Sequence, residues 1–497
     1  MSGARRLDET TRAKLPAGVR QPAYDRAALR VGHAHIGVGA FHRCHQAEYV
    51  EDMLEARLGP WGLVGVNLHP PRIAQAMAAQ DGLYTRTLRQ DVSAQTRLIG
   101  CHRALVEVAD AASAHTAVDA LAAPAIQVVT MTVTEKGYCL TPASGELDLA
   151  NSALAADLAG ADPPRTVLAL LSRALDRRRA IDAGPLTLVS CDNIPANGER
   201  LRTALLGFAA HRHPSLAPWI ERHVAFPCAM VDRIVPASSP NDLDTLEATL
   251  GLRDEAAVFG EPFRQWVIED RFAGDRPPWD LAGAQFVDDA EPYEHIKMRI
   301  LNAAQSTLSH WGALVGLEFS WQAAADPVLS SLVERMLERE TRPTLPHVAG
   351  MEVGPYIASA LARIRNTAIR HRCHQIATDG SQKIVQRLLA PLRTRCAQGL
   401  TAPGLERAVA GWIAYVAAGA RRHGARWTPC DPFAAAIVAR AGAAGDFIAL
   451  ARSVLALDAI FGDDLADDDL ATRIGVDLAG LLGPDPRSYL KRALVDG

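Results

Sequence analysis

The chain has 497 residues, of which 48% are hydrophobic and 22% are charged, and its formal net charge at pH 7 is −4. This length exceeds what one hydrophobic core usually supports, so we expect at least two domains, and the composition excludes a largely disordered protein. The small negative charge gives no reason to expect nucleic acid or an anionic membrane as a partner.

The N-terminal segment, MSGARRLDETTRAK, has no apolar core and is not a signal peptide. The longest uncharged apolar stretch, 408–420, is too short to span a bilayer and predicts a buried helix. The eight cysteines contain no CxxC pair, which favours reduced thiols over disulfides or a zinc site. We therefore predict a cytoplasmic protein without a metal.

Short apolar strands alternate with helices in the first half of the chain, which predicts a parallel sheet covered on both faces. The expected strands are 34–38, 63–68, 126–133 and 186–190, and the expected helices include 46–56 and 164–180. From residue 292 onward only helices are expected: 292–314, 326–341, 356–371, 404–420 and 432–458. The prediction is an α/β domain with a parallel sheet over 1–288, followed by a mostly α-helical domain over 289–497.

A glycine-rich turn joins the first strand to the first helix. In His35–His42, Gly37 permits a tight turn and Gly39 lets backbone amides approach a pyrophosphate. The third glycine of the dinucleotide-binding fingerprint is replaced by His42. The alternative is a glycine-rich turn that binds no nucleotide.

The end of the second strand carries the residues that distinguish NAD from NADP. An acidic residue there would bind the ribose 2′-hydroxyl of NAD, but the sequence has none. Asn67 can bond a hydroxyl, and Arg72 could meet a 2′-phosphate. We expect NAD, because no other basic residues cluster there in the sequence, without excluding NADP.

Only five of the 52 basic residues are lysines, and Lys297 lies in an unusually polar helix. A lysine can lose its proton when desolvated, whereas an arginine stays charged. With Lys297 at zero and about 100° per residue, Glu294 falls near 60°, Gln305 near 80° and Asn302 near 140°. This face predicts either a catalytic site, a solvated face or a packed interdomain network.

Seven sequence blocks then identify a family. They are GVGAFHRCHQA (37–47), TVTEKGYC (132–139), SCDNIPANG (190–198), FPCAMVDRIVP (226–236), EPFRQWVIED (261–270), the helix at 294–305, and DGSQK (379–383). With these blocks the chain resembles the mannitol dehydrogenase family, the polyol-specific long-chain dehydrogenases and reductases, over nearly its whole length. The resemblance implies an α/β Rossmann-type N-terminal domain followed by a mostly α-helical C-terminal domain. It also implies metal-independent hydride transfer between NAD(P) and a ketose-type carbonyl, and it permits a monomer or a small homo-oligomer.

The resemblance also assigns roles to individual residues. Lys297 is the general acid/base, Asn193 and Asn302 hydrogen-bond the developing alkoxide, and Glu294 relays the proton to solvent. Asp232 holds a substrate hydroxyl or orients the lysine. The predicted cofactor-binding residues are Gly37, Gly39, Phe41, Asn67, Thr134 and Glu135.

One position departs from the family signature of a lysine, an asparagine five residues on and a histidine eight on. The histidine is replaced by Gln305, which cannot titrate but can bind a substrate hydroxyl. If the family histidine mainly positions substrate, activity survives with altered specificity, and if its charge matters, activity drops.

Within the family, the segments TEKGYC and 371–383 resemble fructuronate reductases (D-mannonate oxidoreductases) more closely than mannitol 2-dehydrogenases, which tend to read TEGGYC. A uronate carboxylate requires a cationic clamp, for which Lys383 and Arg372 are candidates, with Lys136 as a further charge. Arg372 could equally form a surface ion pair. The expected substrate pair is fructuronate and D-mannonate. The alternative is mannitol and fructose or the substrate pair of another polyol dehydrogenase, and a dinucleotide-binding pseudoenzyme is a remote alternative.

Overall fold

The computed structural model describes residues 5–68, 73–141, 145–421 and 427–496. The chain divides into two compact units, Met1–Glu291 and Pro292–Gly497, whereas the sequence predicts a domain boundary after residue 288. In the part of the chain that the structure describes, no helix is both long enough and apolar enough to cross a lipid bilayer.

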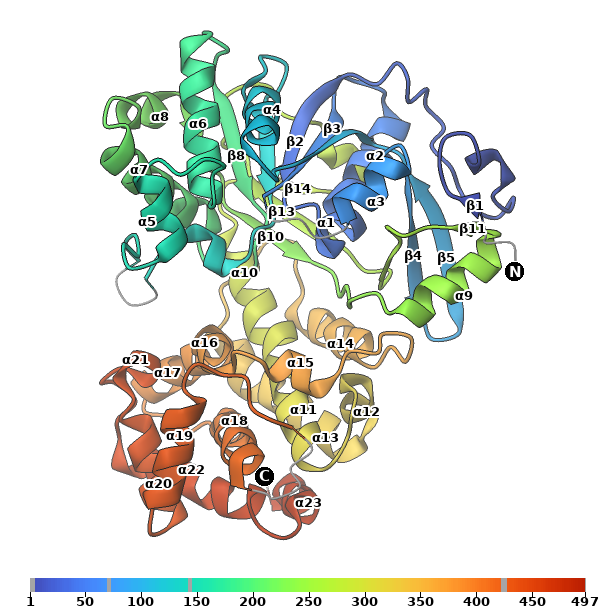
Figure 1. The fold of residues 1–497 in the computed structure, drawn as a ribbon. Helices are drawn as coiled ribbons and strands as arrows, with labels where there is room; N and C mark the ends of the chain where they lie inside the picture. Colours follow the sequence, from blue (N-terminus) through green and yellow to red (C-terminus); the bar gives the residue numbers. More distant parts are fainter. Residues whose placement is uncertain (1–4, 69–72, 142–144, 422–426, 497) are drawn as a thin grey trace. The chain divides into compact units, whose positions relative to one another are not determined.

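A six-stranded parallel sheet forms the centre of the N-terminal unit (Figure 1). In spatial order its strands are β6 (His102–Glu107), β3 (Gly62–Asn67), β2 (Val31–Ile36), β7 (Val128–Met131), β8 (Leu186–Ser190) and β9 (Val224–Ala225). The chain moves outward from β2 to β3 and β6, then returns to place β7 on the other side of β2. The strand order therefore reverses at β2, where doubly wound sheets bind their ligands.

Helices cover one face of this sheet, and helices together with a second sheet cover the other. Ala34 and Ile36 of β2 pack with α4 (Ala111–Ala122), α6 (Val167–Ala180) and α7 (Asn197–Arg212). On the opposite face, Leu63 and Val189 share a core with α2 (Gln46–Ala56), β10 (Ala229–Asp232) and β13 (Gln265–Glu269). This arrangement confirms the predicted Rossmann-type fold of the N-terminal domain. The remaining helices of this unit are α1 (Ala40–Cys44), α3 (Ile73–Ala79), α5 (Ser152–Leu158), α8 (Ala217–His223) and α9 (Pro240–Leu250).

The described residues of this unit also form three smaller sheets, which the sequence analysis does not predict. In the first sheet, β4 (Tyr84–Gln90) forms a hairpin with β5 (Ser93–Ile99) and pairs on its other side with β12 (Val258–Gly260). In the second, β13 lies between β10 and β14 (Gln285–Val287). In the third, β1 (Arg5–Arg6) pairs with β11 (Leu252–Arg253). Several of these strands have two or three residues, and β4 reads YTRTLRQ, so their apolar content is too low to be distinguished from loops.

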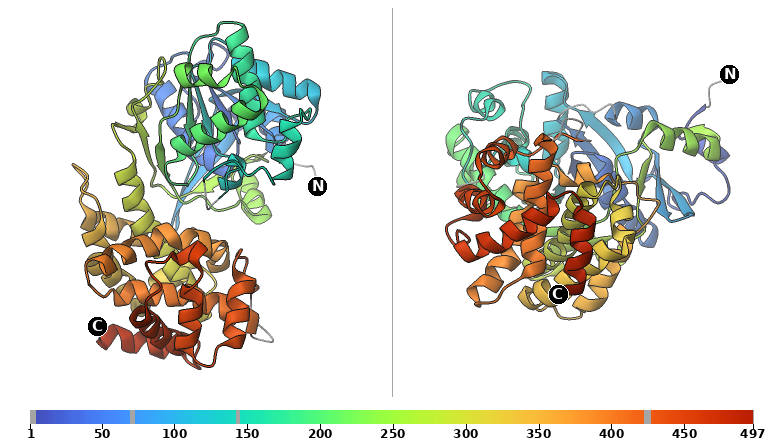
Figure 2. Two further views of the ribbon diagram at one scale, coloured as in Figure 1. Left: turned by 90° about the vertical axis from the view of Figure 1, so that its left-hand side faces the viewer. Right: turned by 90° about the horizontal axis from the view of Figure 1, so that it is seen from below.

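The described part of the C-terminal unit contains helices and no strand of its own (Figure 2), which confirms the predicted helical domain. Its first helix consists of α10 (Glu291–Lys297), a π-helical segment (Met298–Asn302) and α11 (Ala303–Leu314). Its core is built around Trp311 and Trp412, which are fully buried. The other helices are α12 (Ser320–Ala325), α13 (Pro327–Met336) with a π-helical extension (Leu337–Thr341), α14 (Val353–Ile364), α15 (Cys373–Ala377), α16 (Gly380–Ile384) with a π-helical extension (Val385–Leu389), α17 (Ala390–Ala397), α18 (Pro403–Arg421), α19 (Ala434–Ala443), α20 (Phe447–Leu455), α21 (Asp458–Phe461), α22 (Asp468–Leu481) and α23 (Pro486–Asp496).

The single helix predicted over 432–458 is wrong. The chain leaves the helical conformation at Ala444, and Asp446 begins α20 by accepting a hydrogen bond from the backbone N–H of Ala449 at 2.7 Å. An aspartate at this position satisfies an N–H group that has no partner inside the helix. The capping group thus divides an apolar pattern that by itself is compatible with one long helix.

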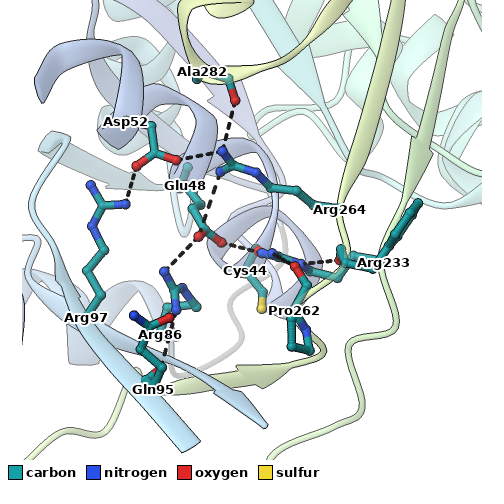
Figure 3. Close-up of polar contacts among 12 residues, drawn as sticks. Cys44, Glu48, Asp52, Arg86, Gln95, Arg97, Arg233, Pro262, Arg264 and Ala282 are labelled. Atoms are coloured by element: carbon teal, nitrogen blue, oxygen red, sulfur yellow. Dashed lines mark hydrogen bonds and ion pairs between the residues drawn. The ribbon is translucent and has the colours of Figure 1, made fainter. Parts of the chain in front are cut away.

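A buried ionic cluster joins α2 to the smaller sheets (Figure 3). The Glu48 carboxylate on α2 lies 2.7 Å from the Arg86 guanidinium on β4 and also pairs with Arg233, which follows β10. Asp52, one turn later, pairs with Arg264 at 2.6 Å and with Arg97. Burial alone would raise the pKa of Glu48, but Arg233 and Arg86 hold it below its ordinary value of 4.5. The Glu48 carboxylate therefore stays ionised and ties α2 to β4 and to the residue that follows β10.

We expect Glu48→Gln to destabilise the protein by about 3 kcal/mol, because it leaves buried guanidinium groups without their counter-charge. A depressed carboxyl pKa stabilises the fold above the unfolded-state pKa, and this contribution disappears as pH falls through the folded-state value. The difference in melting temperature between wild type and Glu48→Gln should therefore be full at pH 7 and shrink in acid. Glu255→Gln, which alters a solvent-exposed pair with Arg253, is the matched control. Equal melting temperatures for Glu48→Gln and wild type at pH 7 would contradict the stabilising role.

Candidate functional site

The glycine-rich turn has the geometry that the sequence predicts. Gly37 has a φ of +91°, and a Cβ added there would lie 2.1 Å from the carbonyl oxygen of Thr132. No side chain fits at this position, because both its conformation and its close approach to β7 require glycine. Gly39 then precedes α1 in an extended conformation. The turn brings the ends of β2 and β7 together at the point where the strand order reverses.

A layer of buried histidines lies beneath this turn, and it explains His42. The His42 ring stacks on His35 with a centroid separation of 3.5 Å, and its Nε2 lies 3.0 Å from Nε2 of His102. His35 Nε2 in turn lies 3.1 Å from the Gly37 carbonyl oxygen. Burial lowers the pKa of all three rings, so they are neutral and form hydrogen bonds as complementary tautomers. A stacked imidazole thus takes the place of the close helix–strand packing that a third glycine would allow.

Asn67 supports the turn from the neighbouring strand. Its side-chain oxygen accepts a hydrogen bond from the backbone N–H of Val38 at 2.8 Å, and the residue is 4% exposed. Its Nδ2 has no hydrogen-bond partner among the described residues. The group of Asn67 without a partner among the described residues is therefore a buried donor. A contact between Asn67 and a cofactor ribose remains a prediction.

A cavity of about 460 Å³ opens beside the turn. Its lining includes predicted cofactor residues (Gly37, Gly39, Asn67 and Thr134) and two cationic side chains that follow β7 in sequence, Lys136 and Arg165. Among the described residues, no carboxylate lines it; the other lining residues are Ile36, Leu68, Thr132, Val133, Gly137, Cys139, Asn151, Ala153, Thr166 and Val167. Backbone amides, hydroxyls and two cations suit an anionic dinucleotide.

Two of the residues considered for the cofactor, Phe41 and Glu135, are not among the described lining residues. Phe41 stacks on His45 with a centroid separation of 4.9 Å, and Glu135 is exposed. Arg72 lies outside the described residues. In the described part of the chain, no group of three or more His, Cys, Asp or Glu side chains is arranged to hold a metal ion.

The predicted catalytic helix is continuous, but its periodicity changes directly after Lys297. Met298–Asn302 is π-helical, so it pairs residues five apart instead of four. Residues five apart, such as Lys297 and Asn302, therefore lie nearer to one face than in an α-helix. The separation of about 140° that α-helical spacing predicts for this pair is wrong. Both residues are buried, with 6% and 8% exposed, while Glu294 and Gln305 are half-buried.

A second helix of the same unit contacts this one through Arg387, which the sequence analysis does not single out. Arg387 is buried and donates hydrogen bonds to the Ser306 hydroxyl at 2.9 Å and to the Asn302 carbonyl at 3.4 Å. Lys383 lies one turn before it and donates to the backbone carbonyls of Ile376 and Thr378. Burial and the Arg387 charge lower the pKa of Lys383 to about 8, and burial lowers that of Arg387 to about 10.

The other predicted substrate residues lie in different settings. Arg372 is 61% exposed and forms an ion pair with Glu318 at 3.3 Å, which is the surface-pair alternative of the sequence analysis. In the N-terminal unit, Asp232 is buried at the end of β10, and Asn193 is exposed on the turn after β8. Roles for these residues in substrate binding or catalysis remain predictions.

Comparison with known proteins gives two family matches. Residues 32–281 match the mannitol dehydrogenase Rossmann domain, and residues 289–481 match the mannitol dehydrogenase C-terminal domain. A D-mannonate oxidoreductase of Escherichia coli (strain K12) is 39% identical over 451 residues, covering 90% of this chain and 92% of that protein. A polyol:NADP oxidoreductase of Gluconobacter oxydans is 40% identical over 384 residues, covering 76% and 78%. The structure of Pseudomonas fluorescens mannitol 2-dehydrogenase in a ternary complex with NAD and D-mannitol superposes with a TM-score of 0.89 at 33% identity, covering 99% and 100%.

Proposed function

The chain belongs to the mannitol dehydrogenase family of oxidoreductases acting on CH–OH groups with a nicotinamide cofactor, and on this premise we propose that it interconverts fructuronate and D-mannonate. The observation that carries this proposal is the pair of cations Lys383 and Arg387. Neither has a carboxylate within ion-pair distance among the described residues, and Arg387 contacts the helix of Lys297 and Asn302. The Asp379 and Asp431 charges raise the pKa of Lys383, but they do not outweigh its burial and the charge of Arg387. An anion that joins two desolvated cations reduces their cost, and a uronate supplies a carboxylate. The relative named D-mannonate oxidoreductase supports the same substrate.

In the proposed reaction the bound nicotinamide supplies or accepts the hydride. Lys297 holds the proton that moves to or from the substrate oxygen, as ammonium in reduction and as amine in oxidation. Asn302 and Asn193 donate hydrogen bonds to that oxygen as its negative charge develops. Glu294 exchanges the proton of Lys297 with solvent. Gln305 holds a substrate hydroxyl.

The second candidate is the mannitol and fructose pair, which the similarity to the mannitol 2-dehydrogenase structure favours. Purified protein assayed against fructuronate, fructose, tagaturonate and arabinitol, each with both cofactors, separates the two. We expect the highest kcat/KM with fructuronate. A higher value with fructose would replace the first candidate with the second. Cofactor binding without turnover of any of these would indicate a pseudoenzyme.

A cytoplasmic location and a monomer or small homo-oligomer also remain predictions.

For the cofactor, NAD is the expectation from the sequence, and we propose that NADP is also accepted. The cavity beside Gly37 contains two cations, Lys136 and Arg165, and no carboxylate among its described lining residues. An acidic residue is what normally excludes the 2′-phosphate of NADP, and a basic one accommodates it. The relative named polyol:NADP oxidoreductase agrees with this proposal, while the structural relative is a complex with NAD.

We expect Lys136→Ala and Arg165→Ala each to weaken NADPH binding by about tenfold, the scale of one charge-assisted hydrogen bond. NADH binding should change by less than about twofold, because NADH has no 2′-phosphate to lose a partner. Fluorescence titration of the two cofactors measures both constants on the same preparation. An equal loss for NADH and NADPH would place these cations at a part of the cofactor that both share.

We expect Lys297→Arg to lower kcat by about a hundredfold or more, because a guanidinium keeps the charge but cannot release a proton near neutral pH. The dissociation constant of NADH should stay close to that of wild type. Steady-state kinetics with fructuronate and a cofactor titration test both statements, with Lys491→Arg, an exposed lysine near the C-terminus, as the matched control. A kcat near that of wild type would show that Lys297 contributes only charge or position.

We expect the KM for fructuronate to rise above pH 8, since the pKa of Lys383 is lowered to about 8 and the carboxylate loses one of its two cations as the amine deprotonates. The rise should stay below about tenfold per pH unit, the limit for a ligand that binds only one protonation state, because Arg387 with its pKa of about 10 stays charged. Lys383→Arg stays charged throughout, so its KM should be higher at pH 7 but independent of pH in this range. Parallel KM–pH profiles for wild type and Lys383→Arg would exclude Lys383 as the titrating group.

A further inference from the structure

We propose that Asp192 is a positioning residue that holds the cofactor-binding turn after β7 and the Asn193 turn after β8 in one fixed arrangement. The role of Asn193 in this statement rests on the proposed function, whereas the role of the β7 turn does not require a substrate. Asp192 directly precedes Asn193 and is 8% exposed. Asp192 follows β8 in the sequence and its carboxylate binds the segment after β7, so this residue connects the two turns.

Three donors converge on this carboxylate. Oδ1 accepts a hydrogen bond from the backbone N–H of Thr134 at 2.9 Å, and Oδ2 accepts one from that of Val133 at 3.1 Å. The Tyr138 hydroxyl also donates to Oδ2, at 2.7 Å. Only an ionised carboxylate accepts on both oxygens without donating. An amide of the same shape would point an N–H group at one of these donors.

The polar groups around Asp192 form a closed cycle. The backbone N–H of Asp192 donates to the Ser190 hydroxyl at 3.3 Å, and the Ser190 hydroxyl contacts the Tyr138 hydroxyl. The Tyr138 hydroxyl in turn donates to the Asp192 carboxylate, which closes the cycle. The Asp192 carbonyl accepts from the Asn197 side chain at 3.0 Å, and the same amide bonds the backbone of Ala229 on β10. The backbone on both sides of Asn193 is thereby fixed, while the Asn193 side chain itself is exposed.

Thr134 gives an independent reason for this clamp. Its backbone has φ +67° and ψ +164°, a region that is essentially restricted to glycine. A threonine stays in this conformation only if its surroundings hold it there, and the hydrogen bond from its own N–H to Asp192 does so. Thr132, Val133 and Thr134 all line the cavity beside Gly37. Loss of the clamp should therefore alter the cofactor site as well as the direction of Asn193.

The test compares Asp192→Asn with Asp254→Asn. Asp254 is a matched control, because it is also buried in the N-terminal unit and accepts hydrogen bonds from Gln80 and Thr85, but it is not among the residues that line the cavity. We expect Asp192→Asn to raise the dissociation constant of NADH by about tenfold and to lower kcat by about tenfold, the scale of one hydrogen bond to a charged group. Asp254→Asn should lower the melting temperature and leave both constants unchanged.

A rescue experiment separates the clamp from general stability. Glycine adopts the Thr134 conformation without strain. The double variant Asp192→Asn/Thr134→Gly should therefore bind NADH at least about threefold more tightly than Asp192→Asn alone. If Asp192→Asn does not fold, Tyr138→Phe removes one of the three donors and should weaken NADH binding by about threefold. NADH binding and kcat unchanged in Asp192→Asn, or a change only in melting temperature as in the control, would overturn the proposal. If Asp192→Asn weakens NADH binding as expected but the wild-type protein turns over no sugar, the result counts against the proposed function and not against the role of Asp192.

Discussion

The N-terminal site depends on one close approach, between the backbone of Gly37 and the carbonyl of Thr132. A Cβ at Gly37 would lie only 2.1 Å from that oxygen, so the ends of β2 and β7 can meet only if this residue is glycine. The buried His35 ring connects the same two residues, because its Nε2 lies 3.1 Å from the Gly37 carbonyl oxygen and 3.0 Å from the Thr132 hydroxyl. From the β8 side, Asp192 holds the two residues that follow Thr132. The cavity beside the turn is therefore formed by groups that fix one another.

The chemistry that we propose for the C-terminal unit depends in a similar way on its first helix. The π-helical segment after Lys297 moves Asn302 toward the face of the lysine, and Arg387 fixes the end of that segment through Asn302 and Ser306. Arg387 also lowers the pKa of Lys383, one turn away. Arg387, which is buried without a carboxylate partner among the described residues, thus affects both the geometry of the Lys297 helix and the protonation of Lys383.

Much of the fold could be predicted from the sequence, because the four central strands are short and largely apolar and most of the helices have regular spacing. The short strands of the smaller sheets could not, since tertiary pairing and not local pattern stabilises them. In the site, Gly37 and the helix of Lys297 were predictable from residue type. The π-helical segment, Arg387 and the Asp192 clamp were not, because each depends on contacts between residues far apart in sequence or on a departure from regular helical geometry. Lys136 and Arg165 were separated by 29 positions in the sequence, and only the fold places both in the cavity.

The central claim is that Lys297 carries the proton that accompanies hydride transfer. The most direct measurement is the single-turnover rate of Lys297→Ala with fructuronate and reduced cofactor in the presence of small primary amines of graded basicity. If Lys297 is the proton carrier, the amines restore part of the rate, and the restored rate depends on the basicity of the amine at constant size. If no amine restores the rate, or if the restored rate is independent of basicity, the lysine contributes only charge or position, and the proton must be carried by another group, first of all Glu294.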